Sequence, residues 1–244
     1  MSGSILHIIA YSFAPVLSAL AGSVTAVVRT PKSGLRSAIQ HFAAGVVFSV
    51  VAVELLPDIM RRHRPVWVVV GFALGIAAMI ALRWFTESKP EAGAGPGKSR
   101  SLPTALIVAT GIDILLDGFL IGLGFVTGEK QGKLLVLALC LEMFSLAIAT
   151  TVTLANSGIS RLKAVVTAVL LALAIPLGSL AATNLLGGAS NGTIESLLSF
   201  GLAALLFLVT EELLVEAHEV PETPWITASF FAGFLLFLVI GMLF

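Results

Sequence analysis

Two carboxylates interrupt an apolar segment that decides the fold of this chain, Thr110-Gly111-Ile112-Asp113-Ile114-Leu115-Leu116-Asp117-Gly118. The apolar stretch runs from about Pro103 to Val126, which is long enough for a membrane-spanning helix. Asp113 lies ten residues beyond Pro103, about 15 Å along a helix that must cross about 30 Å of hydrocarbon. A charged aspartate at that depth costs about 2.5–3.5 kcal/mol, so the pair indicates a functional site.

The spacing of the two aspartates places them on one face of the helix. Asp113 and Asp117 are four residues apart, and side chains at that spacing lie one above the other. Two acids that would otherwise repel each other are thereby held close together. Such an arrangement suits a bound cation or a shared proton.

The composition is that of an integral membrane protein built from helices. Of the 244 residues, 57% are hydrophobic and 11% are charged, whereas an ordinary soluble domain is about 25% charged. The formal net charge of zero and the lack of a basic tract give no indication of nucleic-acid binding. The single cysteine, Cys140, excludes an intramolecular disulfide and a cysteine-rich metal site.

Eight apolar segments predict an all-α membrane protein with eight transmembrane helices in one domain. Each segment is close to the ~20 residues that span a bilayer, and the first is interpreted as a retained helix and not a signal peptide. The predicted spans are 5–28, 38–59, 66–84, 103–126, 133–155, 163–186, 194–217 and 224–244. The longest polar break, 86–101, is rich in glycine, proline and charge and predicts a flexible linker.

An even number of spans places both termini on one side of the membrane. With the termini outside, the inner loops carry nine basic residues, namely Arg29, Lys32, Arg36, Arg83, Lys89, Lys98, Arg100, Arg161 and Lys163. The outer loops carry five, namely Arg61, Arg62, Arg64, Lys130 and Lys133. The positive-inside rule therefore favours termini on the outer side of a plasma or inner membrane, although the Arg61–Arg64 cluster opposes it.

A third acid in hydrocarbon is predicted to join the aspartate pair. Glu142 lies in the fifth apolar segment, at a depth comparable to Asp113 and Asp117 if the fourth and fifth helices are antiparallel neighbours. Ser145 follows nearly one turn later and adds a hydroxyl. The predicted metal ligands, Asp113, Asp117, Glu142 and Ser145, are all oxygen donors, which hard cations prefer. The alternative is a set of protonated acids that serve packing.

Further acids close the second and seventh spans. Glu54 ends the second, and Glu211, Glu212 and Glu216 end the seventh, followed by His218. They are interpreted either as an ion pathway, because clustered carboxylates raise the local cation concentration, or as a solvated helix end. His7 and His41 lie near the starts of spans and are interpreted as interfacial or packing residues.

The order of these motifs across five helices resembles the ZIP (Zrt/Irt-like) family of divalent-metal transporters. The family's fourth-helix motif is matched by Asp113–Gly118 and its fifth-helix motif by Leu141–Ser145. Ile175-Pro176-Leu177-Gly178 is similar to the sixth-helix motif. The second span up to Asp58 and the acidic end of the seventh also resemble their counterparts.

Several metal ligands of that family are replaced in this chain. Asp113 stands where the family has histidine, and Leu141 and Ile175 replace two further ligands. Many family members are thought to hold two adjacent metals. The departures here predict one site, formed by Asp113, Asp117 and Glu142.

The resemblance implies a homodimeric transporter with an inverted repeat, in which helices 1, 4, 5 and 6 move against a scaffold of helices 2, 3, 7 and 8. The expected cargo is a divalent cation such as Mn²⁺, Fe²⁺, Zn²⁺ or Mg²⁺, without a prosthetic group or nucleic-acid partner. The alternatives are a proton-coupled transporter of an organic cation and a metal sensor that no longer transports. An intramembrane enzyme is not expected, because no activated nucleophile lies near the acids.

Overall fold

The computed structural model describes residues 2–87, 104–218, 220, 221 and 223–243. This described part is helical and contains no strand. The predicted linker 86–101 falls outside it, apart from residues 86 and 87, which end a helix. The predicted all-α architecture is confirmed.

Eight helices are long and apolar enough to cross a membrane. Five are single helices, α1 (Ser2–Val28), α4 (Pro65–Glu87), α5 (Thr104–Thr127), α6 (Glu129–Asn156) and α11 (Pro224–Leu243). The second span comprises α2 (Ser33–Val50), η1 (Val51–Leu55) and α3 (Leu56–Arg62). The sixth comprises α7 (Arg161–Ala172) and α8 (Ala174–Leu186), and the seventh α9 (Asn191–Phe207), η2 (Leu208–Leu213) and α10 (Leu214–Ala217). The second span therefore begins five residues before the predicted start at residue 38.

Three of the spans contain a π-helical segment or a break. Pro57 has no N–H to bond the carbonyl of Val53, and the chain there widens into the π-helical segment η1. The seventh span has a similar π segment, η2, without a proline. The sixth span is broken at Leu173, three residues before Pro176.

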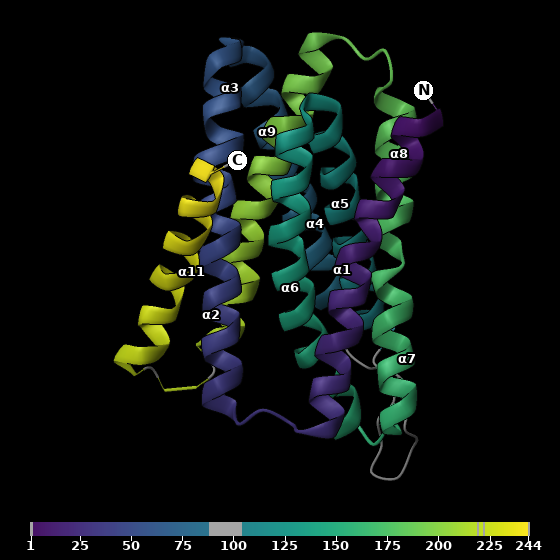
Figure 1. Cartoon of the computed structure of the whole chain (residues 1–244), viewed down its shortest axis with the longest axis vertical. Helices are drawn as coiled ribbons and strands as arrows, with labels where there is room; N and C mark the ends of the chain where they lie inside the picture. Colours follow the sequence, from purple (N-terminus) through teal and green to yellow (C-terminus); the bar gives the residue numbers. More distant parts are fainter. Residues whose placement is uncertain (1, 88–103, 219, 222, 244) are drawn as a thin grey trace.

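The helices associate in four close pairs, α1 with α6, α5 with α8, α2 with α11 and α4 with α9. The first two pairs involve spans 1, 4, 5 and 6, and the last two involve spans 2, 3, 7 and 8. Figure 1 shows α1, α7 and α8 on one side, α2 and α11 on the other, and α6 between them. Exchanging spans 1–3 with 6–8 and span 4 with span 5 maps these four pairs onto one another, as an inverted repeat would require.

Glycines such as Gly118 and Gly178 allow the paired helices to approach closely. A Cβ on Gly118 would collide with the backbone of Ile175, and one on Gly178 would collide with the backbone of Leu115. Gly22 lies equally close to the backbone of Phe144, where α1 crosses α6. Small residues at such crossings are the usual means of packing helices in membranes. The register between α5 and α8 is therefore fixed next to the aspartates.

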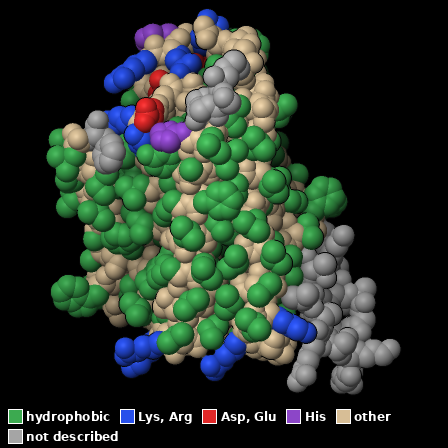
Figure 2. All heavy atoms as spheres, turned by 45° about the vertical axis from the view of Figure 1, so that its right-hand side comes forward, with side chains coloured by type: hydrophobic (Ala, Val, Ile, Leu, Met, Phe, Trp, Pro, Cys, Tyr) green, Lys and Arg blue, Asp and Glu red, His purple; other side chains and the backbone are tan. Residues whose placement is uncertain are grey.

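The distribution of hydrophobic and charged side chains on the outer surface is that of a membrane protein. Figure 2 shows a broad hydrophobic band over the middle of the molecule, with Lys and Arg side chains gathered at its two ends. We call the end with α3, the start of α6 and both termini the upper end, and the opposite end the lower end (Figure 1). The protein is a multi-pass membrane protein with both described ends on the same side.

Candidate metal site

Three buried acids meet between α5 and α6. One carboxylate oxygen from each of Asp113, Asp117 and Glu142 lies within 4.8 Å of the other two. Their side chains are 7%, 3% and 1% exposed, so the cluster is largely shielded from solvent. Only Gly128 lies between α5 and α6, and the two helices are antiparallel neighbours. The prediction that Glu142 lies at the depth of the two aspartates requires this arrangement.

The acid cluster has no basic partner among the described residues. Every ion pair formed there involves other acids. Asp117 Oδ2 and both carboxylate oxygens of Glu142 are buried without a hydrogen-bond donor in the described residues. Burying such a group without a partner costs several kcal/mol, as an order of magnitude. An arrangement of this kind is stable when a cation or protons neutralise it.

Packing on both sides holds the acids in place. Ile114 and Met143, which each adjoin an acid in the sequence, are buried in one apolar cluster with Ile175. Ser18 Oγ on α1 donates a hydrogen bond to the carbonyl of Cys140 (2.5 Å) and ties α1 to α6 near Glu142. The helices that carry the three acids are thus held in position by close helix crossings and by contacts in the apolar core.

The fourth predicted ligand, Ser145, is buried near the acids and forms no hydrogen bond to them among the described residues. It is 1% exposed and lies nearly one turn beyond Glu142. Ile175 is fully buried in the apolar core, and Leu141 packs against the core on its own side. The surroundings of the acids therefore offer no second set of ligands at these positions.

The acids of the seventh span divide into two kinds. Glu212 is exposed, and its charge acts on Asp113, Asp117 and Glu142 alike. Glu216 follows one turn further towards the lower end and interacts with Glu212 in turn. Glu211 instead forms an ion pair with Arg83 of α4 (2.6 Å). A line of carboxylates therefore leads from the cluster towards the lower end, with Glu211 outside it.

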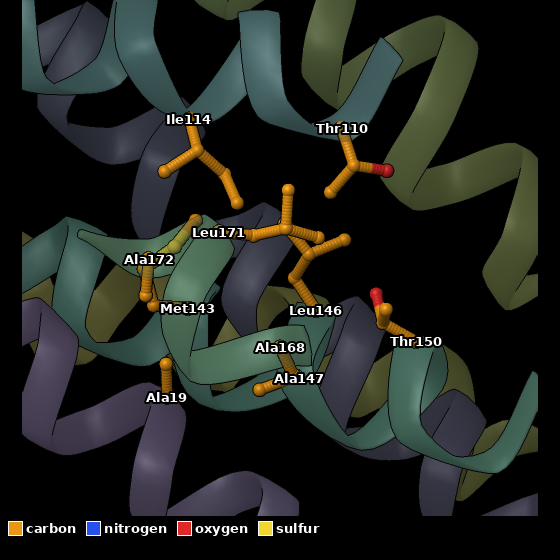
Figure 3. A pocket seen from close by; sticks show the side chains of 10 residues that line it. All are labelled: Ala19, Thr110, Ile114, Met143, Leu146, Ala147, Thr150, Ala168, Leu171 and Ala172. Carbon is orange, nitrogen blue, oxygen red and sulfur yellow. The ribbon is translucent and has the colours of Figure 1, made fainter. Parts of the chain in front are cut away.

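The interior beside the acids is apolar and nearly closed. A cavity of about 10 Å³ lies among α1, α5, α6 and α7, which is at the lower limit for one water molecule. Figure 3 shows Leu171 and Leu146 meeting in the middle of its lining, with Thr110 and Thr150 as the polar members. No acidic side chain lines this cavity, whereas Glu212 is close enough for its charge to act on all three acids of the cluster.

Glu54 belongs to a different region from the acid cluster. It lies in the second span near the upper end, 3.8 Å from Lys130 Nζ at the start of α6. The same ammonium donates a hydrogen bond to the carbonyl of Gly241 on α11 (3.0 Å). Lys130 therefore connects α6 to Glu54 of the second span and to the eighth span, at the end of the molecule opposite Glu212 and Glu216.

The sequence prediction missed one deeply buried acid, Glu195. Its side chain is 0% exposed and lies 3.9 Å from Arg62 of α3, which also binds Asp58 (3.1 Å). Glu195 is only four residues from the start of α9, a position in the sequence that is typical of an interfacial residue. Its burial depends on the packing of α9 against other helices, which include α3 and α4.

No protein-family model matches this chain, and no curated protein matches it.

Proposed function

We propose that this protein carries divalent metal cations across a membrane through the acid cluster, on a fold related to that of the ZIP family. The observation that carries the proposal is the set of three carboxylate oxygens within 4.8 Å of one another. Metal–oxygen distances of about 2.0–2.6 Å let one ion touch oxygens about 4–5 Å apart. The cluster therefore has the dimensions of a site for one bare ion.

The size and chemistry of the cluster favour a metal ion over an organic cation. Oxygens this close together leave no room for an organic group between them, and the adjoining cavity of about 10 Å³ adds none. The donors are all carboxylates, which suit Mn²⁺, Mg²⁺ and Fe²⁺ as well as Zn²⁺. Protons compete with the metal for the same oxygens, so binding weakens as the solution becomes more acidic.

The helix arrangement supports alternating access. Asp113, Asp117 and Glu142 all lie on spans 4 and 5, whereas Glu212 lies on span 7 in the other group of helices. A displacement of spans 1, 4, 5 and 6 against the rest would carry the ion past Glu212 and Glu216. We propose entry or exit of the ion along these two carboxylates, a homodimeric assembly, and both termini on the outer side of the membrane.

Uptake into proteoliposomes tests the function. Purified protein is reconstituted and supplied in turn with Zn²⁺, Mn²⁺, Fe²⁺, Cd²⁺ and Mg²⁺, and wild type is compared with Glu142→Gln. Glu129→Gln is the matched control, because Glu129 lies on the same helix but is 65% exposed and paired with Lys133. We expect uptake of at least one metal by wild type and Glu129→Gln, and none by Glu142→Gln.

The same assay separates the alternatives. Absence of uptake and of binding for every metal would overturn the proposal. Transport of an organic cation that divalent metals do not inhibit would favour a proton-coupled transporter of organic cations. Metal binding without transport would favour a sensor.

A further inference from the structure

A second group of metal-ligating side chains lies at the lower end, outside the acid cluster. His41 of α2 and His218 at the end of α10 come from spans two and seven, and their ring centroids are 5.1 Å apart. His41 is 3% exposed and His218 is exposed. The pair therefore reaches from the protein interior to the solvent.

The hydrogen bonds of the two rings fix the same tautomer. His41 Nδ1 lies 2.9 Å from the carbonyl oxygen of Ser37, and His218 Nδ1 lies against the carbonyl oxygen of Leu214. A carbonyl oxygen only accepts, so Nδ1 is the protonated nitrogen in each ring. In the neutral imidazole, Nε2 then carries the lone pair. Metal-binding histidines commonly donate the opposite N–H to a backbone carbonyl in this way.

A contact between the two spans holds the rings together. Ser37 Oγ donates a hydrogen bond to the carbonyl of Ala217 (2.7 Å), the residue before His218. Ser37 thus binds His41 through its carbonyl and the chain beside His218 through its hydroxyl. Ser37, one helical turn before His41 in the sequence, therefore positions both histidine side chains.

The ring separation agrees with a shared ion. A Zn–N distance of about 2.0–2.1 Å and a tetrahedral angle place the centroids of two coordinating imidazoles about 5 Å apart. The observed 5.1 Å is close to this value. Imidazole nitrogen favours Zn²⁺, Cu²⁺ and Ni²⁺, whereas the acid cluster offers oxygen alone.

We propose that His41 and His218 form a second metal site for an imidazole-preferring divalent ion, with water completing its coordination. The site does not depend on transport through the acid cluster.

Copper binding tests this site in protein in which two of the three acids of the cluster have been neutralised. Purified Asp113→Asn/Asp117→Asn protein in detergent is titrated with Cu²⁺, and bound copper is examined by electron paramagnetic resonance. We expect one ion with two coordinating imidazole nitrogens. Adding His218→Gln weakens binding by about tenfold or more and removes one nitrogen from the spectrum.

His7→Gln is the matched control, because His7 lies on α1 and contacts Tyr11 instead. Copper affinity and spectrum are expected to be unchanged by it. His41→Gln should reproduce the loss seen with His218→Gln, provided that its melting temperature shows a folded protein. If His41→Gln does not fold, the result with His218→Gln decides the test, because His218 is exposed. Equal affinity and an unchanged spectrum in His218→Gln, or an equal loss in His7→Gln, would overturn the proposal.

Discussion

Buried acids occur in this protein in two different settings. Glu195 and Glu54 lie near the upper end, 3.9 Å from Arg62 and 3.8 Å from Lys130, respectively. The cluster of Asp113, Asp117 and Glu142 has no cation of the described chain beside it. An acid with a basic partner contributes to the association of helices. Acids that face only one another are costly to bury, so we assign the cluster to a function and the paired acids to the framework.

Asp117→Asn gives the largest expected effect. It removes a charged ligand, so metal binding should weaken by about 100-fold or more, and uptake should be lost. The melting temperature of the metal-free protein should stay the same or rise, because the neutral amide relieves repulsion among the acids. Binding isotherms and thermal unfolding in detergent measure the two quantities. A large loss of stability with intact binding would place the cluster with the framework acids.

Gly118→Ala tests whether the close crossing of α5 and α8 positions the cluster. The added methyl collides with the backbone of Ile175, so the helices must separate, at about 1–3 kcal/mol. We expect weaker metal binding together with reduced thermal stability.

Gly111→Ala is the control on the same helix, since its methyl would meet only the flexible Leu171 side chain at 3.3 Å. Stability and binding equal to wild type in both variants would contradict this role of the crossing.

Arg62→Met tests the framework acids. It leaves the carboxylate of Glu195 buried without its cation and also removes the partner of Asp58. Because Arg62 is 26% exposed, we expect a loss of about 2 kcal/mol, below the value for a fully buried pair. Adding Glu195→Gln should recover part of that loss. Metal affinity, measured in parallel, should not change; a selective loss of affinity would move Glu195 into the functional group.

Ser145→Ala should have the smallest effect. The hydroxyl is buried but forms no hydrogen bond to the acids in the described chain, so metal affinity should change by less than about threefold. Titration with the metal that wild type transports measures this directly. A drop comparable to that of Asp117→Asn would restore Ser145 as a ligand.

The sequence indicated the acid cluster because charge in hydrocarbon is rare and the helical period is fixed. Four-residue spacing placed Asp113 and Asp117 on one face, and the short connection to the next span placed Glu142 opposite them. Glu195 could not be found in this way, because a glutamate near the start of α9 becomes buried only when other helices, including α3 and α4, pack against α9. His41 and His218 are 177 positions apart, and only the contact between the second and seventh spans brings their rings together.

The sequence by itself determined the eight apolar spans, the irregularity near Pro176, and the depth of the three acids. Hydropathy, helical geometry and the missing N–H of proline are local properties, so they can be read without knowing the fold. Only the tertiary structure decided which acids acquired basic partners, which remained together without one, and that two distant histidines meet. Those outcomes depend on helix crossings between spans far apart in the chain, where small residues and single side-chain contacts set the register.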